Sequence, residues 1–198
     1  MARTIAKDYD EKRGQILKSA AKVFATEGFD RASMALLARE CGISKANIYH
    51  YYESKDAILF DILDSYLSAL RDRICTLPLE GMDAEARFRR VVGEILMAYQ
   101  GQDYEHKVQM NALGSLPEDQ QDLLRSYQRD LVRFTADTLC ACAPPSLADD
   151  REKRRAATMS LFGMLNWYHM WNTGAGREAR ESYARLVCDL TLKGLPGL

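Results

Sequence analysis

The sequence predicts an all-α protein of nine helices. Apolar residues recur at helical spacing along most of the chain, and no segment alternates in the way that a half-buried strand requires. Gly, Pro and short polar clusters interrupt this spacing where helices would end. At 198 residues, the chain is long enough for one or two small domains with a substantial apolar core.

The first helix is predicted over residues 10–27. Ile16, Ala20 and Phe24 lie on one helical stripe of this segment. Gly28 follows it, and glycine ends a helix at little cost because it readily adopts a left-handed backbone conformation. In a three-helix domain, this helix would cross behind the two helices that follow it and supply core.

Residues 33–52 predict two short helices joined by a tight turn. Four apolar residues within 34–41 fall at i, i+3, i+4 and i+7, which is one face of a helix. Ser33 precedes this stripe as a capping residue, Gly42 follows it, and Ser44 offers a second cap two residues later. Two helices joined in this way around a glycine match a helix-turn-helix motif.

The second helix of this motif has an unusual exposed surface. Ile43, Ile48 and Tyr52 can face inward, whereas the side chains between them are left outside. Lys45 supplies charge for phosphates, and Asn47 can hydrogen-bond the major-groove edge of adenine. The alternative is an ordinary amphipathic hairpin whose tyrosines are half buried. The residues predicted to contact DNA are Ser33, Ser44, Lys45, Ala46, Asn47, Tyr49, His50 and Lys55.

Four segments carry a resemblance to a known family. They read KVFATEGF at 22–29, SM at 33–34, GISK at 42–45 and IYHYYESK at 48–55. Together they resemble the DNA-binding domain of TetR-family transcriptional regulators, over roughly residues 10–57 without a gap. The number of predicted helices, nine, is also typical of that family.

Two departures from the family pattern are visible. Ala32 stands where the family usually has Thr, which removes a candidate phosphate contact. Ala46-Asn47 stands where Gly-Thr is common, which changes the base-reading surface and leaves the operator sequence open. The resemblance implies a TetR-like fold, with a DNA-binding helix-turn-helix domain at residues 1–57 and a helical ligand-binding and dimerisation domain at residues 58–198.

Six more helices are predicted after the motif. Ser54 caps the first of them, and Pro78 marks its end. In the family this helix links the two domains, and its tilt transmits ligand binding to the DNA-reading helices. Pro144-Pro145 and the cluster at 172–176 separate the last three helices. The six span residues 55–77, 83–100, 104–113, 117–141, 146–171 and 177–193.

Residues 161–171, LFGMLNWYHMW, are apolar almost all round. A helix of this kind must be covered on more than one side, by its own core, a ligand cavity or a partner subunit. Asn166, His169 and the indole N–H groups are polar handles that a fully apolar core would leave unpaired. The alternative is a large aromatic core helix or a plain dimer interface. The segment resembles a TetR-family branch that responds to acyl-CoA thioesters, and regulators of phenylacetate breakdown are the nearest type.

An acyl-CoA effector needs an apolar pocket for its acyl group and cations for its phosphates. Arginines cluster at 87–90, and the cations at 151–155 lie one to three turns before the aromatic segment. Solvated surface charge and core packing are the alternatives for these residues. The predicted ligand-binding residues are Arg87, Arg90, Tyr99, Met110, Tyr127, Phe134, Arg155, Phe162, Asn166, Trp167, His169 and Trp171.

The last two helices are predicted to pair with their counterparts across a two-fold axis. Tyr183, Leu186, Val187 and Leu190 form an apolar face at i, i+3, i+4 and i+7, and Tyr168 is assigned to the same interface. A homodimer would present two reading heads to the palindromic half-sites of an operator in double-stranded DNA.

Composition sets bounds on the function. The net charge is −1, but residues 1–55 carry ten Lys and Arg against seven Asp and Glu, which suits a mildly basic DNA-binding head on an acidic body. No apolar run approaches the ~18 residues of a membrane span, and the N-terminus lacks the apolar core of a signal peptide. We therefore expect a cytoplasmic protein with no membrane partner. The five cysteines lack C-x-x-C spacing, and no metal site or cofactor is predicted.

The resulting hypothesis is a ligand-responsive repressor. An acyl-CoA thioester, with phenylacetyl-CoA as the first candidate, would release it from its operator. The alternative is the same class of repressor with a different small hydrophobic or aromatic effector, and the remote alternative is a small thioester-processing enzyme. An enzyme is not predicted, because the sequence shows no Ser-His-Asp arrangement, paired acids, phosphate-binding glycine loop or H-E-x-x-H motif.

Overall fold

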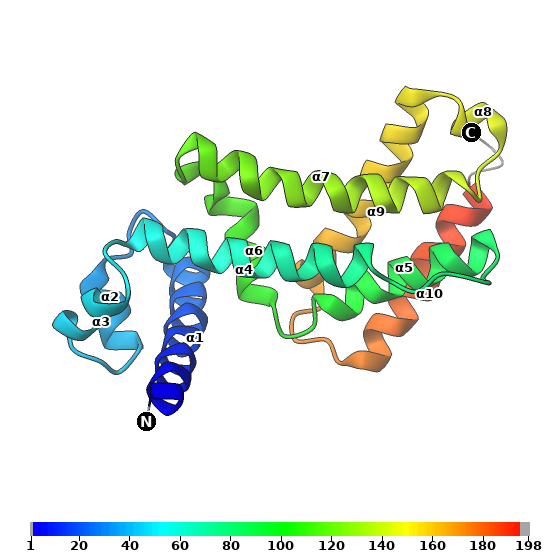
Figure 1. Ribbon diagram of the computed structural model, residues 1–198. Helices are drawn as coiled ribbons and strands as arrows, with labels where there is room; N and C mark the ends of the chain where they lie inside the picture. The colour runs from blue at the N-terminus through cyan, green and yellow to red at the C-terminus, as the bar shows by residue number, and fades with distance from the viewer. Residues whose placement is uncertain (1, 195–198) are drawn as a thin grey trace. The chain divides into compact units, whose positions relative to one another are not determined.

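The computed structural model describes the backbone of residues 2–194 and the side chains of residues 8–194. Over this range the chain is all-α, as predicted, and contains no strand (Figure 1). Ten α-helices and one 3₁₀ turn, η1, follow one another. They are α1 (Ala2–Glu27), α2 (Met34–Glu40), α3 (Lys45–Tyr51), α4 (Lys55–Cys75), α5 (Ala84–Ala98), α6 (Asp103–Ala112), η1 (Leu113–Ser115), α7 (Glu118–Cys140), α8 (Pro145–Ala148), α9 (Arg151–Trp171) and α10 (Arg177–Gly194).

The described residues hold ten α-helices where nine were predicted, because the helix predicted over 146–171 is divided. The short α8 ends at Ala148, and α9 begins three residues later. Between them, the Asp150 carboxylate accepts hydrogen bonds from the backbone N–H groups of Glu152 and Lys153, at 2.9 and 3.0 Å. A side chain that caps the backbone in this way starts a new helix. The prediction of one continuous helix is therefore wrong at this point.

The first helix is also longer than predicted. α1 begins at Ala2, eight residues before the predicted start. Residues 2–7 contain no Gly or Pro, so nothing in the sequence ends the helix before them. Asp8 and Tyr9, which lie before the predicted start, are therefore part of α1.

The turn between α2 and α3 has the predicted construction. Ser33 Oγ accepts from the backbone N–H of Leu36 at 3.2 Å, and Ser44 Oγ accepts from that of Asn47 at 3.1 Å. Gly42, between the two helices, has a φ of +65°, which only glycine adopts without strain. The two short helices therefore form the helix-turn-helix that the sequence predicts.

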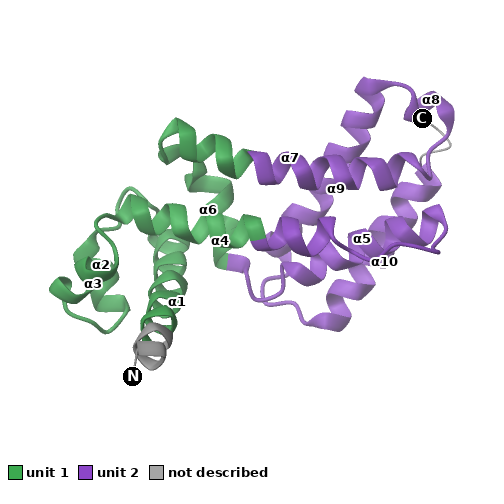
Figure 2. Cartoon of the chain, viewed as in Figure 1, with its two compact units in different colours: residues 1–68, 104–125 green, residues 69–103, 126–198 purple. Residues whose placement is uncertain are grey.

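The chain forms two compact units. Unit 1 comprises residues 1–68 and 104–125, and unit 2 comprises residues 69–103 and 126–198 (Figure 2). Three boundaries separate the units. Those after residues 68 and 125 fall inside long helices, so α4 and α7 each have residues in both units, and the one after residue 103 falls at the first residue of α6. This division is one of packing, and the functional boundary after residue 57 stays a prediction.

Each unit has its own apolar core. In unit 1, α1 packs against α2 and α2 against α3, and Ile16, Leu37 and Ile48 are fully buried there. In unit 2, α10 packs against α5 and α9, with Val92 and Val187 fully buried. No helix among the described residues has the length and apolar character needed to cross a membrane.

Candidate functional site

The helix α3 presents a polar surface on unit 1. Ile48 is the one buried residue among its seven, so most of the helix faces outward. Tyr49 is 47% exposed although it is a large aromatic residue. The exposed residues of this helix are Lys45, Ala46, Asn47, Tyr49 and His50. They are the five residues of α3 that were predicted to contact DNA.

The other three predicted DNA contacts have structural partners. The hydroxyls of Ser33 and Ser44 cap α2 and α3 as acceptors, so each hydroxyl proton is left to donate to another group. Lys55 Nζ donates to the carbonyl oxygens of Phe29 and Asp30 at 2.9 and 3.2 Å, and it lies 4.4 Å from the centre of the Phe29 ring. Lys55 therefore ties the start of α4 to the turn before α2, and its contact with DNA stays a prediction.

An aromatic cluster joins the N-terminal half of α1 to α3. The ring of Tyr9 stacks on that of Tyr51, with centroids 4.9 Å apart. The imidazole of His50 lies edge-on to both rings, at 5.5 Å from Tyr51 and 6.4 Å from Tyr9. The cluster orients His50 while leaving it exposed. It depends on the early start of α1 and was not predicted.

A polar network lies at the end of α3, and two of its three members were not predicted. Tyr52, the residue after α3, is 6% exposed. Its hydroxyl donates to Asp61 Oδ2 of α4 at 2.6 Å and accepts from Arg13 Nε of α1 at 3.0 Å. Arg13 also forms an ion pair with the Asp61 carboxylate. One signal was available: an inward-facing tyrosine needs a partner for its hydroxyl.

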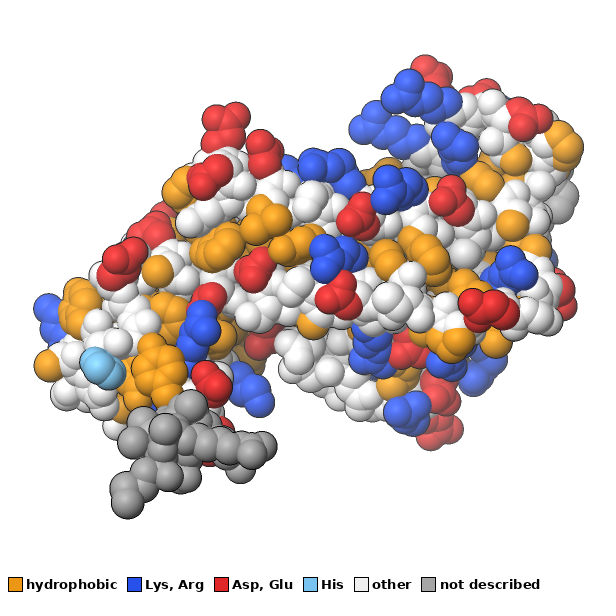
Figure 3. Space-filling model, in the orientation of Figure 1, with side chains coloured by type: hydrophobic (Ala, Val, Ile, Leu, Met, Phe, Trp, Pro, Cys, Tyr) orange, Lys and Arg blue, Asp and Glu red, His pale blue; other side chains and the backbone are white. Residues whose placement is uncertain are grey.

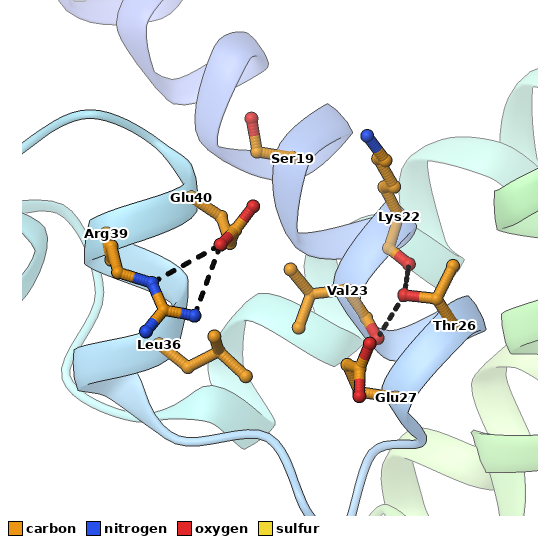
Figure 4. A pocket seen from close by; sticks show the side chains of 8 residues that line it. All are labelled: Ser19, Lys22, Val23, Thr26, Glu27, Leu36, Arg39 and Glu40. Carbon is orange, nitrogen blue, oxygen red and sulfur yellow. Dashed lines mark hydrogen bonds and ion pairs between the residues drawn. The ribbon is translucent and has the colours of Figure 1, made fainter.

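A groove of about 550 Å³ runs between α1 and α2 (Figure 4). Lys22 and Arg39 line it together with Glu27 and Glu40, so its charges balance. Arg39 hydrogen-bonds the neighbouring Glu40 at 3.4 Å, and all four charged side chains are exposed. A groove of this composition offers a charged ligand no net attraction.

In unit 2, the structure brings three of the predicted ligand-binding residues together. The hydroxyl of Tyr99 donates to Asn166 Oδ1 at 2.8 Å. Burial raises the pKa of Tyr99 well above its ordinary value, so the hydroxyl remains a donor. His169 Nδ1 lies 2.8 Å from the carbonyl oxygen of Asn166, and because a carbonyl only accepts, Nδ1 carries the proton. Two of the polar handles of the aromatic helix, the side chains of Asn166 and His169, therefore have hydrogen-bond partners within their own chain.

The remaining predicted ligand-binding residues are scattered. Phe162 is buried, and Tyr127 and Phe134 are partly buried. The guanidinium of Arg71 lies 4.5 Å from the centre of the Tyr127 ring. Met110, Trp167 and Trp171 are exposed by 53%, 59% and 59%, so within one chain they enclose nothing.

The two predicted groups of arginines lie on different helices, and Arg87 and Arg90 of the first group are exposed. On α5, Arg87 Nε donates to the carbonyl of Met82 at 2.9 Å, and Arg90 lies 3.5 Å from Glu94 of the same helix. The cations at the beginning of α9 are also all exposed, and Figure 3 shows Lys and Arg gathered over this part of the helix. They are Arg151, Lys153, Arg154 and Arg155.

The predicted dimer residues divide into two sets. Leu186 and Leu190 are exposed by 52% and 57%, and Tyr183 is partly exposed. Val187 and Tyr168 are almost completely covered within their own chain. The Tyr168 ring stacks on that of Tyr183, with centroids 4.4 Å apart. These two buried residues therefore support the exposed face from behind and are not on its surface.

Sequence reasoning also missed a buried arginine. Arg180 of α10 is 1% exposed, and its guanidinium donates to three parts of unit 2. The acceptors are Ala175 O at 2.9 Å, Leu96 O at 3.3 Å and Asp103 Oδ1 at 3.4 Å. The guanidinium also lies 5.7 Å from the centre of the Tyr168 ring. A charged residue on a helix gives no sequence signal that it is buried, because most are not.

Comparisons with known families cover both parts of the chain. Residues 16–62 match the family described as bacterial regulatory proteins of the tetR family, and residues 81–195 match the tetracyclin repressor-like C-terminal domain. The second match alone covers more than half of the chain. The chain belongs to the TetR family. It is a helix-turn-helix transcriptional regulator, and the relatives that it matches are named as regulators rather than enzymes.

Solved structures of TetR-family regulators agree with this fold. A regulator from Bordetella parapertussis 12822 is 32% identical, with a TM-score of 0.85 over 94% of this chain and 96% of that one. AibR, solved in complex with isovaleryl coenzyme A and operator DNA, is 19% identical, with a TM-score of 0.75 over 90% of this chain and 97% of that one. At this low identity, AibR supports the fold alone.

Among curated relatives, the uncharacterised HTH-type transcriptional regulator YuxN of Bacillus subtilis (strain 168) is 30% identical over 135 residues. The match covers 65% of this chain and 45% of YuxN, so the chain spans less than half the length of that relative.

Among the described residues, no group of three or more His, Cys, Asp or Glu side chains is arranged to hold a metal ion.

Proposed function

We propose that this TetR-family regulator is a repressor that binds a palindromic operator as a homodimer and leaves it when a small molecule binds the C-terminal domain. The exposed surface of α3 carries the DNA-binding part of the proposal. This surface combines the ammonium group of Lys45, the amide of Asn47 and the phenol of Tyr49, and only one residue of the helix is buried. These are the groups that bind phosphates and read base edges in the major groove. Because the protein would act on the chromosome, the proposal places it in the cytoplasm.

Replacing Lys45 or Tyr49 with alanine is expected to weaken operator binding about tenfold for each substitution, because each removes one phosphate or base contact. The operator is first selected from random-sequence DNA with the wild-type protein, and binding is then followed by fluorescence anisotropy. Lys107→Ala, which removes an exposed lysine of α6, is the matched control. Wild-type affinity in both test variants, with the dimer intact, would mean that α3 is not the reading helix.

The dimer proposal is supported by the exposed apolar residues of α9 and α10. These two helices hold six of the twelve large apolar side chains that are exposed in the described residues. They also form a groove of about 430 Å³. The stripe along α9 begins with small residues, which allow a partner helix to approach closely. The two stripes consist of Ala156, Ser160, Gly163, Trp167 and Met170 on α9, and Tyr183, Leu186 and Leu190 on α10.

The effector proposal is an acyl-CoA thioester, with phenylacetyl-CoA as the first candidate. The exposed cations at the start of α9 support it, since CoA phosphates require them. The buried aromatic side chains of Tyr99 and Phe162 would suit an acyl group. AibR, a regulator of the same fold, was solved with isovaleryl coenzyme A. The alternative is a different small hydrophobic or aromatic effector.

Thermal unfolding with phenylacetyl-CoA, a long-chain acyl-CoA, free CoA and free phenylacetate tests this proposal. A ligand at 100 times its Kd should add about 2.7 kcal/mol of stability, which raises the midpoint measurably. We expect phenylacetyl-CoA to give the largest shift. The double variant Arg154→Ala and Arg155→Ala should lose most of that shift while unfolding normally without ligand. If no CoA compound raises the midpoint, the effector is not an acyl-CoA, and the DNA-binding proposal is unaffected.

A further inference from the structure

The reading helix α3 is held to the rest of unit 1 at few points. Its N-terminal end is capped by Ser44, and Ile48 is its one buried side chain. Seven residues make a helix about 10 Å long. A helix of this length that turns about one buried side chain moves its ends by about 1 Å for a small tilt, which is more than a well-held recognition site tolerates. At the other end of the helix, the ring of Tyr51 stacks on that of Tyr9 of α1, and a further anchor is needed to hold the helix against α4.

The polar network of Arg13, Tyr52 and Asp61 supplies that anchor. Tyr52 ends α3, and its N–H donates to the carbonyl of Ile48 at 3.0 Å, so the position of its ring is coupled to the last turn of the helix. Its hydroxyl is held by Asp61 of α4 and Arg13 of α1. Burial, and after it the hydrogen bond to Asp61, raises the pKa of the Tyr52 hydroxyl above its ordinary value, so it remains a donor.

We propose that Tyr52 and Asp61 are positioning residues for operator recognition, and that their hydrogen bond fixes the tilt of α3 against α4. Neither residue needs to touch DNA for this role. The inference rests on the proposed function of α3 as the reading helix. It adds a prediction that the surface contacts alone do not make: a buried hydroxyl contributes to sequence-specific affinity.

Positioning and simple electrostatics predict opposite effects at Asp61. Replacing this carboxylate with an amide removes one negative charge from the DNA-binding unit. By charge alone, the change would strengthen binding to the polyanion. If the carboxylate instead holds Tyr52 and Arg13 in place, its loss frees the end of α3 and weakens binding to the operator.

The experiment measures the affinity of Tyr52→Phe and Asp61→Asn for the selected operator and for scrambled DNA of the same length. We expect each variant to lose about tenfold in operator affinity, the size of one misplaced base contact. Affinity for scrambled DNA should stay the same for Tyr52→Phe and stay the same or rise for Asp61→Asn, because phosphate contacts dominate there. The double variant should lose no more than the larger single loss, since Tyr52→Phe removes the hydroxyl and Asp61→Asn leaves it only a neutral acceptor, so both substitutions act on the same hydrogen bond.

Asp56→Asn is the matched control, because it removes the same charge from an exposed position on the same helix. It should retain wild-type operator affinity or gain slightly. Operator affinity within twofold of wild type in Tyr52→Phe and Asp61→Asn would overturn the positioning role while leaving α3 as the reading helix. An equal loss on both DNAs would also overturn it, because that result indicates a general loss of structure. If wild-type protein shows no preference for any DNA sequence, both this inference and the proposed function fail.

Discussion

Replacing Leu186 and Leu190 together with glutamate is expected to convert the proposed homodimer to a monomer. Both side chains are more than half exposed on α10, and the two-fold axis would place each substitution in the interface twice. Four new carboxylates would have to be buried without partners, which raises the dimer Kd by about 100-fold or more. Sedimentation velocity at micromolar concentration would detect the change directly.

Because this variant loses dimerisation, its affinity for the operator should fall as well. Two linked DNA-binding domains bind adjacent half-sites far more tightly than one domain alone, because the second domain binds intramolecularly. Arg185→Glu, at an exposed position elsewhere on α10, changes the net charge by the same amount and should remain dimeric. A double variant that stays dimeric would move the interface away from α10 and contradict the dimer proposal.

The helix-turn-helix could be predicted in detail because its signals are local. Ser33, Gly42 and Ser44 act within three residues of their own positions, and the structure confirms the caps and the left-handed turn. The exposed surface of α3 follows from the same periodicity once Ile48 is placed inward. Local spacing therefore determines both the motif and the side chains that it presents.

The C-terminal helices were less predictable because their faces depend on distant partners. Residues 161–171 are apolar all round, so periodicity could not decide which side meets the core. The structure buries Tyr168 and exposes Trp167. In the same way, Val187 and Leu186 are adjacent in an apolar run, and only the packing of α10 against α5 separates the buried one from the exposed one.

Partners far apart in the sequence were missed for a related reason. Asp61 lies nine residues from Tyr52 and 48 from Arg13, and no periodic signal links an acid, a phenol and a guanidinium at such spacings. An inward-facing hydroxyl indicates that a partner exists, but the fold decides which one. The same holds for Arg180 and Asp103, which are 77 residues apart.

Replacing Arg180 with methionine is expected to lower the free energy of unfolding by about 3 kcal/mol. Methionine has a similar length and keeps most of the packing, so the loss comes from the hydrogen bonds. The carbonyl oxygens of Ala175 and Leu96 would lose a donor inside unit 2. Urea unfolding followed by circular dichroism at a fixed protein concentration measures the change, and the concentration matters because a dimer gains stability from association.

Arg177→Met is the matched control for this substitution. Arg177 lies three residues earlier on α10 and pairs with Glu181 at 3.4 Å, but its side chain is 72% exposed. A solvated pair of this kind contributes little, so the control should change the unfolding free energy by no more than about 0.5 kcal/mol. Similar losses in the two variants would mean that the guanidinium of Arg180 contributes no more than a surface charge.

The ranking of three variants separates the charge of Arg180 from its geometry. Asp103→Asn keeps an acceptor and removes a carboxylate that is 23% exposed and 3.4 Å from the guanidinium, so we expect a loss below about 1 kcal/mol. Arg180→Lys keeps the charge but cannot reach three separate acceptors with the planar fork of arginine, so its loss should be intermediate. If Asp103→Asn destabilises as much as Arg180→Met, the ion pair dominates. The expected order, with methionine worst, would instead show that the two buried carbonyl groups hold the start of α10 in place.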